Sequence, residues 1–95
     1  MRNYEGTFIF RPSLDEAGLE EEMGKVEELI TGEGGAIKEW DKWGKRRLAY
    51  EIKAEHDGYY AFLTFEADPA AIEKLVAAYR LRENILRNMN IVMDE

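Results

Sequence analysis

Side chains that could perform catalysis are scarce in this chain. A catalyst needs a nucleophile, a general base or a metal site, and the sequence has no cysteine and a single histidine, His56. His56 lies beside Asp57 and Gly58 in a segment typical of an exposed turn. The crowded carboxylates of residues 20–28 are typical of a solvated helix face, because paired catalytic acids usually occupy dissimilar environments. We expect no catalytic residue, no metal and no cofactor.

Arg11 is the residue that best suits a known enzyme architecture. Acylphosphatase-like proteins place a phosphate-binding arginine in the loop after their first strand, where Arg11 lies. The next residue, Pro12, has no amide proton to donate to a phosphate. The loop contains no glycine, and no asparagine between Asn3 and Asn84 could orient a water molecule. The sequence therefore favours a protein without enzymatic activity.

An aromatic strand offers a different chemistry, the stacking of nucleic-acid bases. The segment Tyr60-Ala61-Phe62-Leu63-Thr64-Phe65 is similar to the core of the RNA-recognition-motif signature, and its alternation turns Tyr60 and Phe62 away from the helices. Gly58 and Tyr59 replace the basic residue and the glycine that open that signature. Strand propensity and packing explain the same aromatics. A stand-alone module for single-stranded RNA is therefore an alternative function.

The charge of the chain is unevenly distributed. The net charge is −7, and the segment from Asp15 to Glu33 carries eight acids and one base, so the remaining segments sum to zero. Seven of the twelve bases outside that segment fall in two groups: Lys42, Lys45, Arg46 and Arg47, then Arg80, Arg82 and Arg87. The first group could merely protect an edge strand from aggregation, but phosphate contact also needs clustered bases. We predict an acidic back and a basic working face.

Periodicity predicts four strands and two helices. Alternation or apolar runs place strands over residues 4–10, 36–53, 59–66 and 85–93, with a bulge at Gly44 and a turn at 55–58. The first helix begins at a capping box, Ser13 to Glu16, and ends at Gly32. The second begins at Asp68-Pro69 and ends near residues 82–84. This βαββαβ order predicts an α+β, ferredoxin-like fold: a four-stranded antiparallel sheet with both helices on one face.

Size and hydropathy bound the class of protein. A chain of 95 residues normally forms one domain, which we assign to residues 1–95. No segment approaches the roughly 18 consecutive apolar residues of a membrane span, and the N-terminus shows no signal-peptide core. We expect a soluble, cytoplasmic protein with no membrane partner and no small-molecule substrate.

Several motifs together resemble one family, bacterial small-subunit ribosomal protein six. They are Arg2-Asn3-Tyr4-Glu5, Trp43-Gly44-Lys45-Arg46-Arg47-Leu48-Ala49-Tyr50-Glu51-Ile52, Gly58-Tyr59-Tyr60 and Arg80-Leu81-Arg82-Glu83-Asn84-Ile85-Leu86-Arg87. The resemblance covers essentially the whole chain. The second motif is the most specific, because strand formation does not demand a Trp-Gly pair followed by a basic run and Leu-Ala-Tyr.

The resemblance implies a structural, non-enzymatic component of the small ribosomal subunit. It also implies binding to 16S ribosomal RNA together with small-subunit ribosomal protein eighteen. A very basic partner would explain how an acidic protein can bind RNA. The RNA or partner contacts that the resemblance and the base clusters suggest are Arg2, Tyr4, Lys45, Arg46, Arg47, Tyr60, Phe62 and Arg87.

Overall fold

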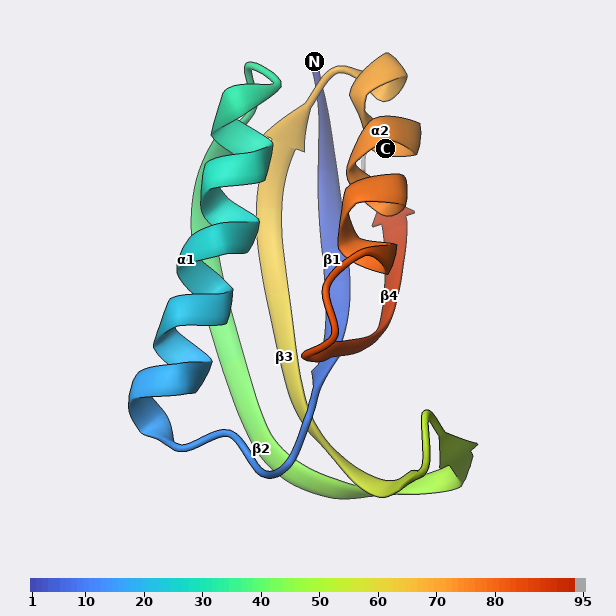
Figure 1. Ribbon diagram of the computed structural model, residues 1–95. Coiled ribbons are helices and arrows are strands. Elements are labelled where there is room, and N and C mark those ends of the chain that lie inside the picture. The colour runs from blue at the N-terminus through green and yellow to red at the C-terminus, as the bar shows by residue number, and fades with distance from the viewer. Residues whose placement is uncertain (94–95) are drawn as a thin grey trace.

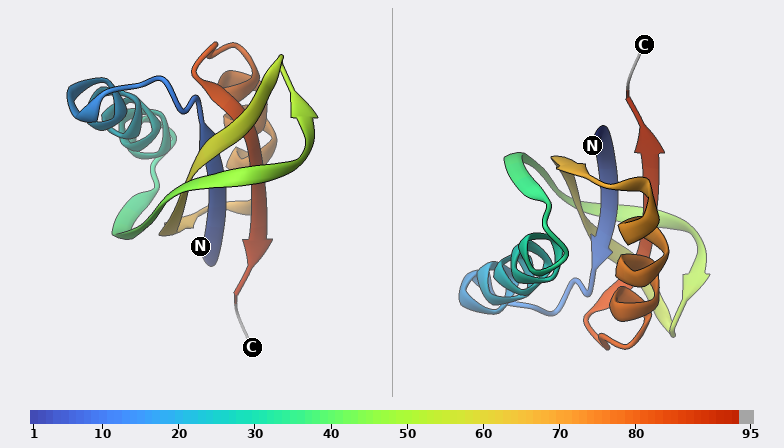
Figure 2. Two further views of the ribbon diagram at one scale, coloured as in Figure 1. Left: turned by 90° about the horizontal axis from the view of Figure 1, so that it is seen from below. Right: turned by 90° about the horizontal axis from the view of Figure 1, so that it is seen from above.

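The structure, a computed structural model, describes residues 1–93 and has the predicted βαββαβ order (Figure 1). Its elements are β1 (Arg2–Phe10), α1 (Glu16–Gly32), β2 (Ala36–Ile52), β3 (Glu55–Ala67), α2 (Pro69–Arg80) and β4 (Ile85–Val92). The strands form one antiparallel sheet in the order β2-β3-β1-β4. Both helices cover the same face of that sheet (Figures 1 and 2). The predicted fold class is confirmed.

The main core lies between this helix-covered face and the helices. Every second residue of β1 points into it, and β3 aligns its own apolar residues in register, with Phe8 opposite Ala61 and Tyr4 opposite Phe65. Phe8 is fully buried and packs edge-on against the ring of Tyr79 from α2. The alternation that predicted the strands therefore also selects the face that they bury.

The helix N-termini agree with the sequence in one case and differ in the other. Asp68 caps α2 as predicted, because its carboxylate accepts the Ala70 amide at 2.9 Å. The capping box predicted at Ser13 for α1 is wrong. The N-cap is Asp15, whose carboxylate accepts the Gly18 amide at 2.7 Å, because the chain still turns at Leu14, whose amide donates to the Arg11 carbonyl.

The long hairpin of β2 and β3 contains the predicted bulge but not the predicted turn. Gly44 has a φ of +89°, and the β2–β3 register shifts between Lys42 and Gly44. The turn expected at residues 55–58 is wrong, because those residues belong to β3. The connection is instead a tight two-residue turn at Lys53 and Ala54, both with positive φ, which closes the pair Ile52–Glu55.

Packing explains why Gly58 lies in a strand although Asp57-Gly58 is typical of a turn. A Cβ atom on Gly58 would lie 2.3 Å from Cγ2 of Ile9. Glycine is therefore needed at this position for close approach and not for positive φ.

The outer half of the hairpin folds back over the face of the sheet that carries no helix, called here the helix-free face. Leu48 forms a second buried cluster with Ile9 of β1 and Leu86 of β4, flanked by Ile52 and Tyr60. Figure 2 (left) shows this part of β2 crossing β1 and β4. The hairpin tip consequently reaches the beginning of β4, far from its own position in the strand order.

Candidate nucleic-acid interface

Six of the thirteen lysine and arginine side chains form ion pairs within residues 1–93. They bind carboxylates at 2.9–3.9 Å and are Arg11, Lys25, Lys38, Lys42, Lys74 and Arg82. Arg2 also has an intramolecular interaction. A base that already holds a carboxylate has little charge left to offer a phosphate. The six bases paired with carboxylates are therefore poorer candidates for RNA contacts.

Six bases have no carboxylate partner within residues 1–93, and we call them the free bases. They are Lys45, Arg46, Arg47, Lys53, Arg80 and Arg87. Four lie on the outer half of the hairpin, and two lie where α2 ends and β4 begins. Because the hairpin folds back toward β4, these two segments share one end of the molecule. The free bases therefore lie at one end of the molecule, although not on a single face.

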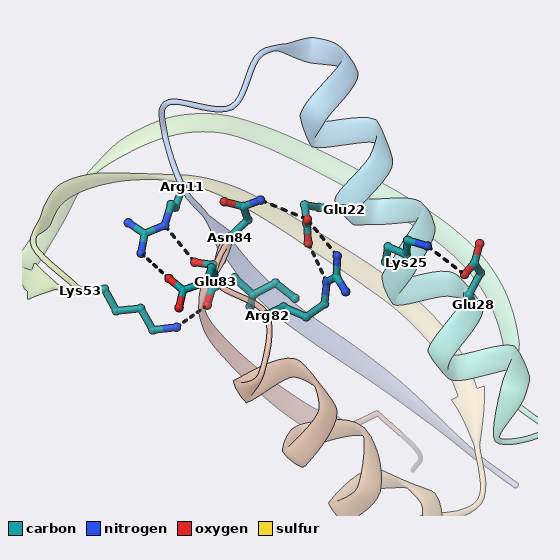
Figure 3. Close-up of polar contacts among 9 residues, drawn as sticks. Arg11, Glu22, Lys25, Glu28, Lys53, Arg82, Glu83 and Asn84 are labelled. Atoms are coloured by element: carbon teal, nitrogen blue, oxygen red, sulfur yellow. Dashed lines mark hydrogen bonds and ion pairs between the residues drawn. The ribbon is translucent and has the colours of Figure 1, made fainter.

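Two bases that the sequence placed in the basic groups are not available. Lys42 binds Glu20 at 3.0 Å, and Arg82 forms a bidentate pair with Glu22 at 2.9 and 3.1 Å (Figure 3). The expectation that the helix carboxylates are all solvated is wrong for Glu22, which is only 6% exposed. Hydrogen bonds from Arg82, and also from Asn84, lower the pKa of Glu22 against the opposing effect of burial.

Arg87 and Tyr60 are brought together on the helix-free face. They line a hollow of about 290 Å³ with Thr7, Ile9 and Met89. One guanidinium nitrogen of Arg87 donates to the hydroxyl of Tyr50 from the folded-back hairpin. The hollow therefore combines a fixed cation with an aromatic ring, the two groups that bind a phosphate and a base.

The helix-free face also carries an aromatic pair, in which Trp43 is exposed and Phe62 is half-buried. Phe62 contacts Trp43 of β2, with ring centroids 4.8 Å apart, and Trp43 is 52% exposed. The outward orientation predicted for Tyr60 and Phe62 is consistent with the burial of their neighbours Ala61 and Leu63. Trp43 was not among the predicted contacts, although its place beside the basic run was a usable signal.

Lys45, Arg46 and Arg47 do not all lie on one side of the hairpin. Lys45 lines a separate hollow beside the start of α1, near Asp15 and Glu16. Successive side chains of a strand point to opposite faces, so Arg46 lies on the opposite side of β2 from Lys45 and Arg47. The three bases therefore present charge on both sides of the hairpin.

Tyr4 lies in the core. Its ring is 7% exposed and stacks on Phe65 at 5.6 Å between centroids. No surface contact can use this ring without opening the fold. Tyr4 is therefore not available to an RNA or protein partner.

Arg11 is committed to structure and not to a phosphate site. Its guanidinium binds Glu55 at 2.9 Å. It also binds the Glu83 carboxylate at 3.6 Å, and Nε donates to the Glu83 carbonyl (Figure 3). In the described part of the chain, no group of three histidine or carboxylate side chains could hold a metal ion. No helix there is both long and apolar enough to span a membrane.

Comparison with known proteins decides the family. A family model described as ribosomal protein S6 matches residues 3–92. The chain belongs to the ribosomal protein S6 family. The small ribosomal subunit protein bS6 of Clostridium kluyveri is 44% identical over 95 residues, covering all of this chain and 99% of that protein. The bS6 protein of Clostridium botulinum is 38% identical over 94 residues, covering 99% of this chain and all of that protein.

Solved structures agree with this S6 assignment. The crystal structure of 30S ribosomal protein S6 from Thermotoga maritima matches with a TM-score of 0.87 and 30% identity, covering 97% of this chain and 87% of that one. The C-terminal domain of the MgtC protein from Mycobacterium tuberculosis shares only the fold, with a TM-score of 0.59 and 14% identity. As an S6 family member, the chain is a structural protein of the small ribosomal subunit, a cytoplasmic particle in bacteria, and not an enzyme.

Proposed function

We propose that this chain binds 16S ribosomal RNA together with small-subunit ribosomal protein eighteen. The observation that carries the proposal is the segregation of the free bases. All six lie on the hairpin or at the α2–β4 end, and none has a carboxylate partner in residues 1–93. Most of the other bases are paired with carboxylates. Contacts between phosphates and Lys or Arg supply a large share of the affinity of nucleic-acid-binding proteins, and bases without a carboxylate partner are the most available for them.

The acidic net charge explains why a second protein is needed. A charge of −7 repels a polyanion at long range, so the free bases alone should bind RNA weakly. Exposed apolar side chains on the helix-free face, including Trp43, Met89 and Ile91, suit contact with a partner. Asp41 and Glu5 occupy the same face, opposite Phe62 and Ile91 in register. That combination fits a basic protein partner.

The test is binding of a 16S fragment by a charge-reversed variant. Arg46→Glu, Arg47→Glu and Arg87→Glu are combined, and binding is measured at physiological salt with protein eighteen present. We expect a large loss of affinity with an unchanged circular dichroism spectrum. Reversing Lys25 and Lys74, which are already paired with Glu28 and Glu33, alters net charge elsewhere and should have little effect. Undiminished binding by the arginine variant would reject the interface.

A stand-alone RNA-recognition module is the second candidate, favoured by the outward aromatics of β3. Such a module would bind single-stranded RNA without a protein partner. Replacing Tyr60 and Phe62 by alanine would then remove about 1–3 kcal/mol per stacked base. We expect instead that the isolated chain binds single-stranded RNA weakly. Tight binding that these two substitutions abolish would establish the second candidate.

A further inference from the structure

The structure contains a second basic hollow, at the corner where α2 ends, β4 begins and the hairpin tip folds back. It has a volume of about 400 Å³, and its lining includes Lys53, Arg80, Arg87 and Asn88. We propose that this corner hollow binds a phosphate of the RNA backbone, which makes Lys53 and Arg80 RNA contacts. The inference rests on the proposed function and adds two residues to its interface.

Charge distinguishes this hollow from the rest of an acidic molecule. Three of its lining residues are bases and none is a carboxylate. Within residues 1–93, no carboxylate lies within 4 Å of the charged atoms of Lys53, Arg80 or Arg87. Three unneutralised cations around one concave site hold an anion better than the same cations spread over a convex surface.

The ammonium group of Lys53 is positioned by one hydrogen bond and has further N–H donors that could bind a ligand. Its turn conformation, with a φ of +49°, carries it to β4, where Nζ donates to the Ile85 carbonyl at 3.1 Å (Figure 3). An ammonium group has three donors, so two remain for a ligand. Arg80 makes no side-chain hydrogen bond within residues 1–93, which leaves its guanidinium available.

The end of α2 does not repel an anion as strongly as an open helix terminus would. Free carbonyls at a helix C-terminus carry partial negative charge. Here the carbonyls of Ala78 and Tyr79 accept the amides of Leu81 and Arg82 at 3.1 Å each. Arg80 itself lies in the last turn. Arg80 therefore adds a positive charge where the end of α2 borders the corner hollow.

Continuity with the other hollows argues for a polymer and not a free anion. The corner hollow and the hollow of Tyr60 share Arg87 and Met89, and a third, of about 130 Å³, also includes Arg87 and Tyr60. A single phosphate ion would need only one of these sites. A nucleic-acid backbone presents phosphates in succession, so one strand can occupy adjoining sites on either side of Arg87.

The test measures the salt dependence of binding to a 16S fragment with protein eighteen present. Each phosphate contact contributes about 0.7–0.9 to the slope of log K against log[salt]. The variant Lys53→Gln with Arg80→Gln should lower the slope by about that amount between about 50 and 200 mM salt, and weaken binding at every concentration. Lys25→Gln with Lys74→Gln removes the same charge and should leave the slope unchanged. Lys53→Arg with Arg80→Lys should restore it.

Each outcome separates this inference from the proposed function. In one outcome, the wild type binds the fragment, and the Lys53 and Arg80 variant has the same salt-dependence slope as the Lys25 and Lys74 control. The corner hollow then does not contact RNA, and the wider interface of the proposed function is retained. If the wild type does not bind the 16S fragment even with protein eighteen present, the proposed function and this inference are both rejected. Saturable binding of inorganic phosphate, abolished by the Lys53 and Arg80 variant while the RNA slope is unchanged, would assign the hollow to a free anion and overturn the inference.

Discussion

The buried pair of Glu22 and Arg82 provides the sharpest test of how this fold is stabilised. The carboxylate of Glu22 accepts two hydrogen bonds from Arg82 and one, at 3.2 Å, from Asn84. The substitution Glu22→Gln keeps the shape of the side chain but removes its charge. The amide oxygen can take the Oε2 position and keep the bonds from Nη2 of Arg82 and from Asn84, but the new NH₂ group then faces the Nε–H donor of Arg82. One hydrogen bond is therefore lost, two donors oppose each other, and the charge that strengthened the remaining bonds is removed.

The size of the effect follows from burial. Hydrogen bonds to charged groups are worth about 1.5–3 kcal/mol each. The side chain of Glu22 is 8% exposed, but that of Arg82 is 31% exposed, so water can replace part of what the arginine loses. We expect a net destabilisation of about 2 kcal/mol, well below the roughly 3–5 kcal/mol of a fully buried broken pair. In a domain of this size that lowers Tm by about 10 °C.

Urea unfolding at neutral pH measures this difference. Glu21→Gln is the matched control, because Glu21 is the preceding residue of α1 and is exposed. The control should change the free energy of unfolding by less than about 0.5 kcal/mol. If Glu22→Gln and Glu21→Gln unfold at the same urea concentration, the reasoning about this pair is refuted.

The pH dependence tests whether charge is the cause. The pKa of Glu22 in the folded protein lies below its ordinary value of 4.5, so folding favours the carboxylate. Its contribution is fully present above the unfolded-state pKa and is lost as the pH falls through the lower folded-state pKa. The difference between wild type and Glu22→Gln should therefore shrink below pH 4.5. A difference that persists undiminished in acid would instead indicate a packing defect.

Two further substitutions test local structure by urea unfolding. Gly58→Ala should destabilise by about 2 kcal/mol, because its Cβ atom would overlap Ile9 at 2.3 Å and force the second cluster apart; an unchanged midpoint would contradict the close approach. Asp68→Ala should cost about 1 kcal/mol, because the Ala70 amide loses its acceptor. A neutral result there, with Asp68→Asn also neutral, would show that the cap does not stabilise α2.

Local patterns in the sequence predicted most of the fold. Alternation along β1 and β3, the Asp68-Pro69 start of α2 and the bulge at Gly44 each depend on residues adjacent in the chain. The turn at Lys53 and Ala54 escaped prediction because neither residue is typical of positive φ. Gly58 was wrongly predicted to lie in a turn, because glycine is typical of turns. Here glycine is required by the close approach of Ile9, a residue distant in the sequence, and not by local backbone geometry.

The candidate interface was less predictable because it depends on contacts between distant segments. Composition alone counted Arg82 among the available bases, and only the fold brings it to Glu22, 60 residues away. Lys53 gave no signal, because its neighbourhood on β4 exists only after the hairpin folds back. Arg87 and Tyr60 were both predicted contacts, but the sequence could not show that they line one hollow.

The folded-back hairpin tip is less stably held than the rest of the molecule. The main core joins both helices to the sheet, whereas the hairpin tip is tied down chiefly by the small cluster of Ile9, Leu48 and Leu86. Fewer buried contacts mean that the tip opens at a lower free energy than the core does. Several of the lysine and arginine side chains that would contact RNA therefore lie on the segment that can most easily change its position. A polyanion that orders this segment would tighten the hairpin against the sheet without disturbing the helices.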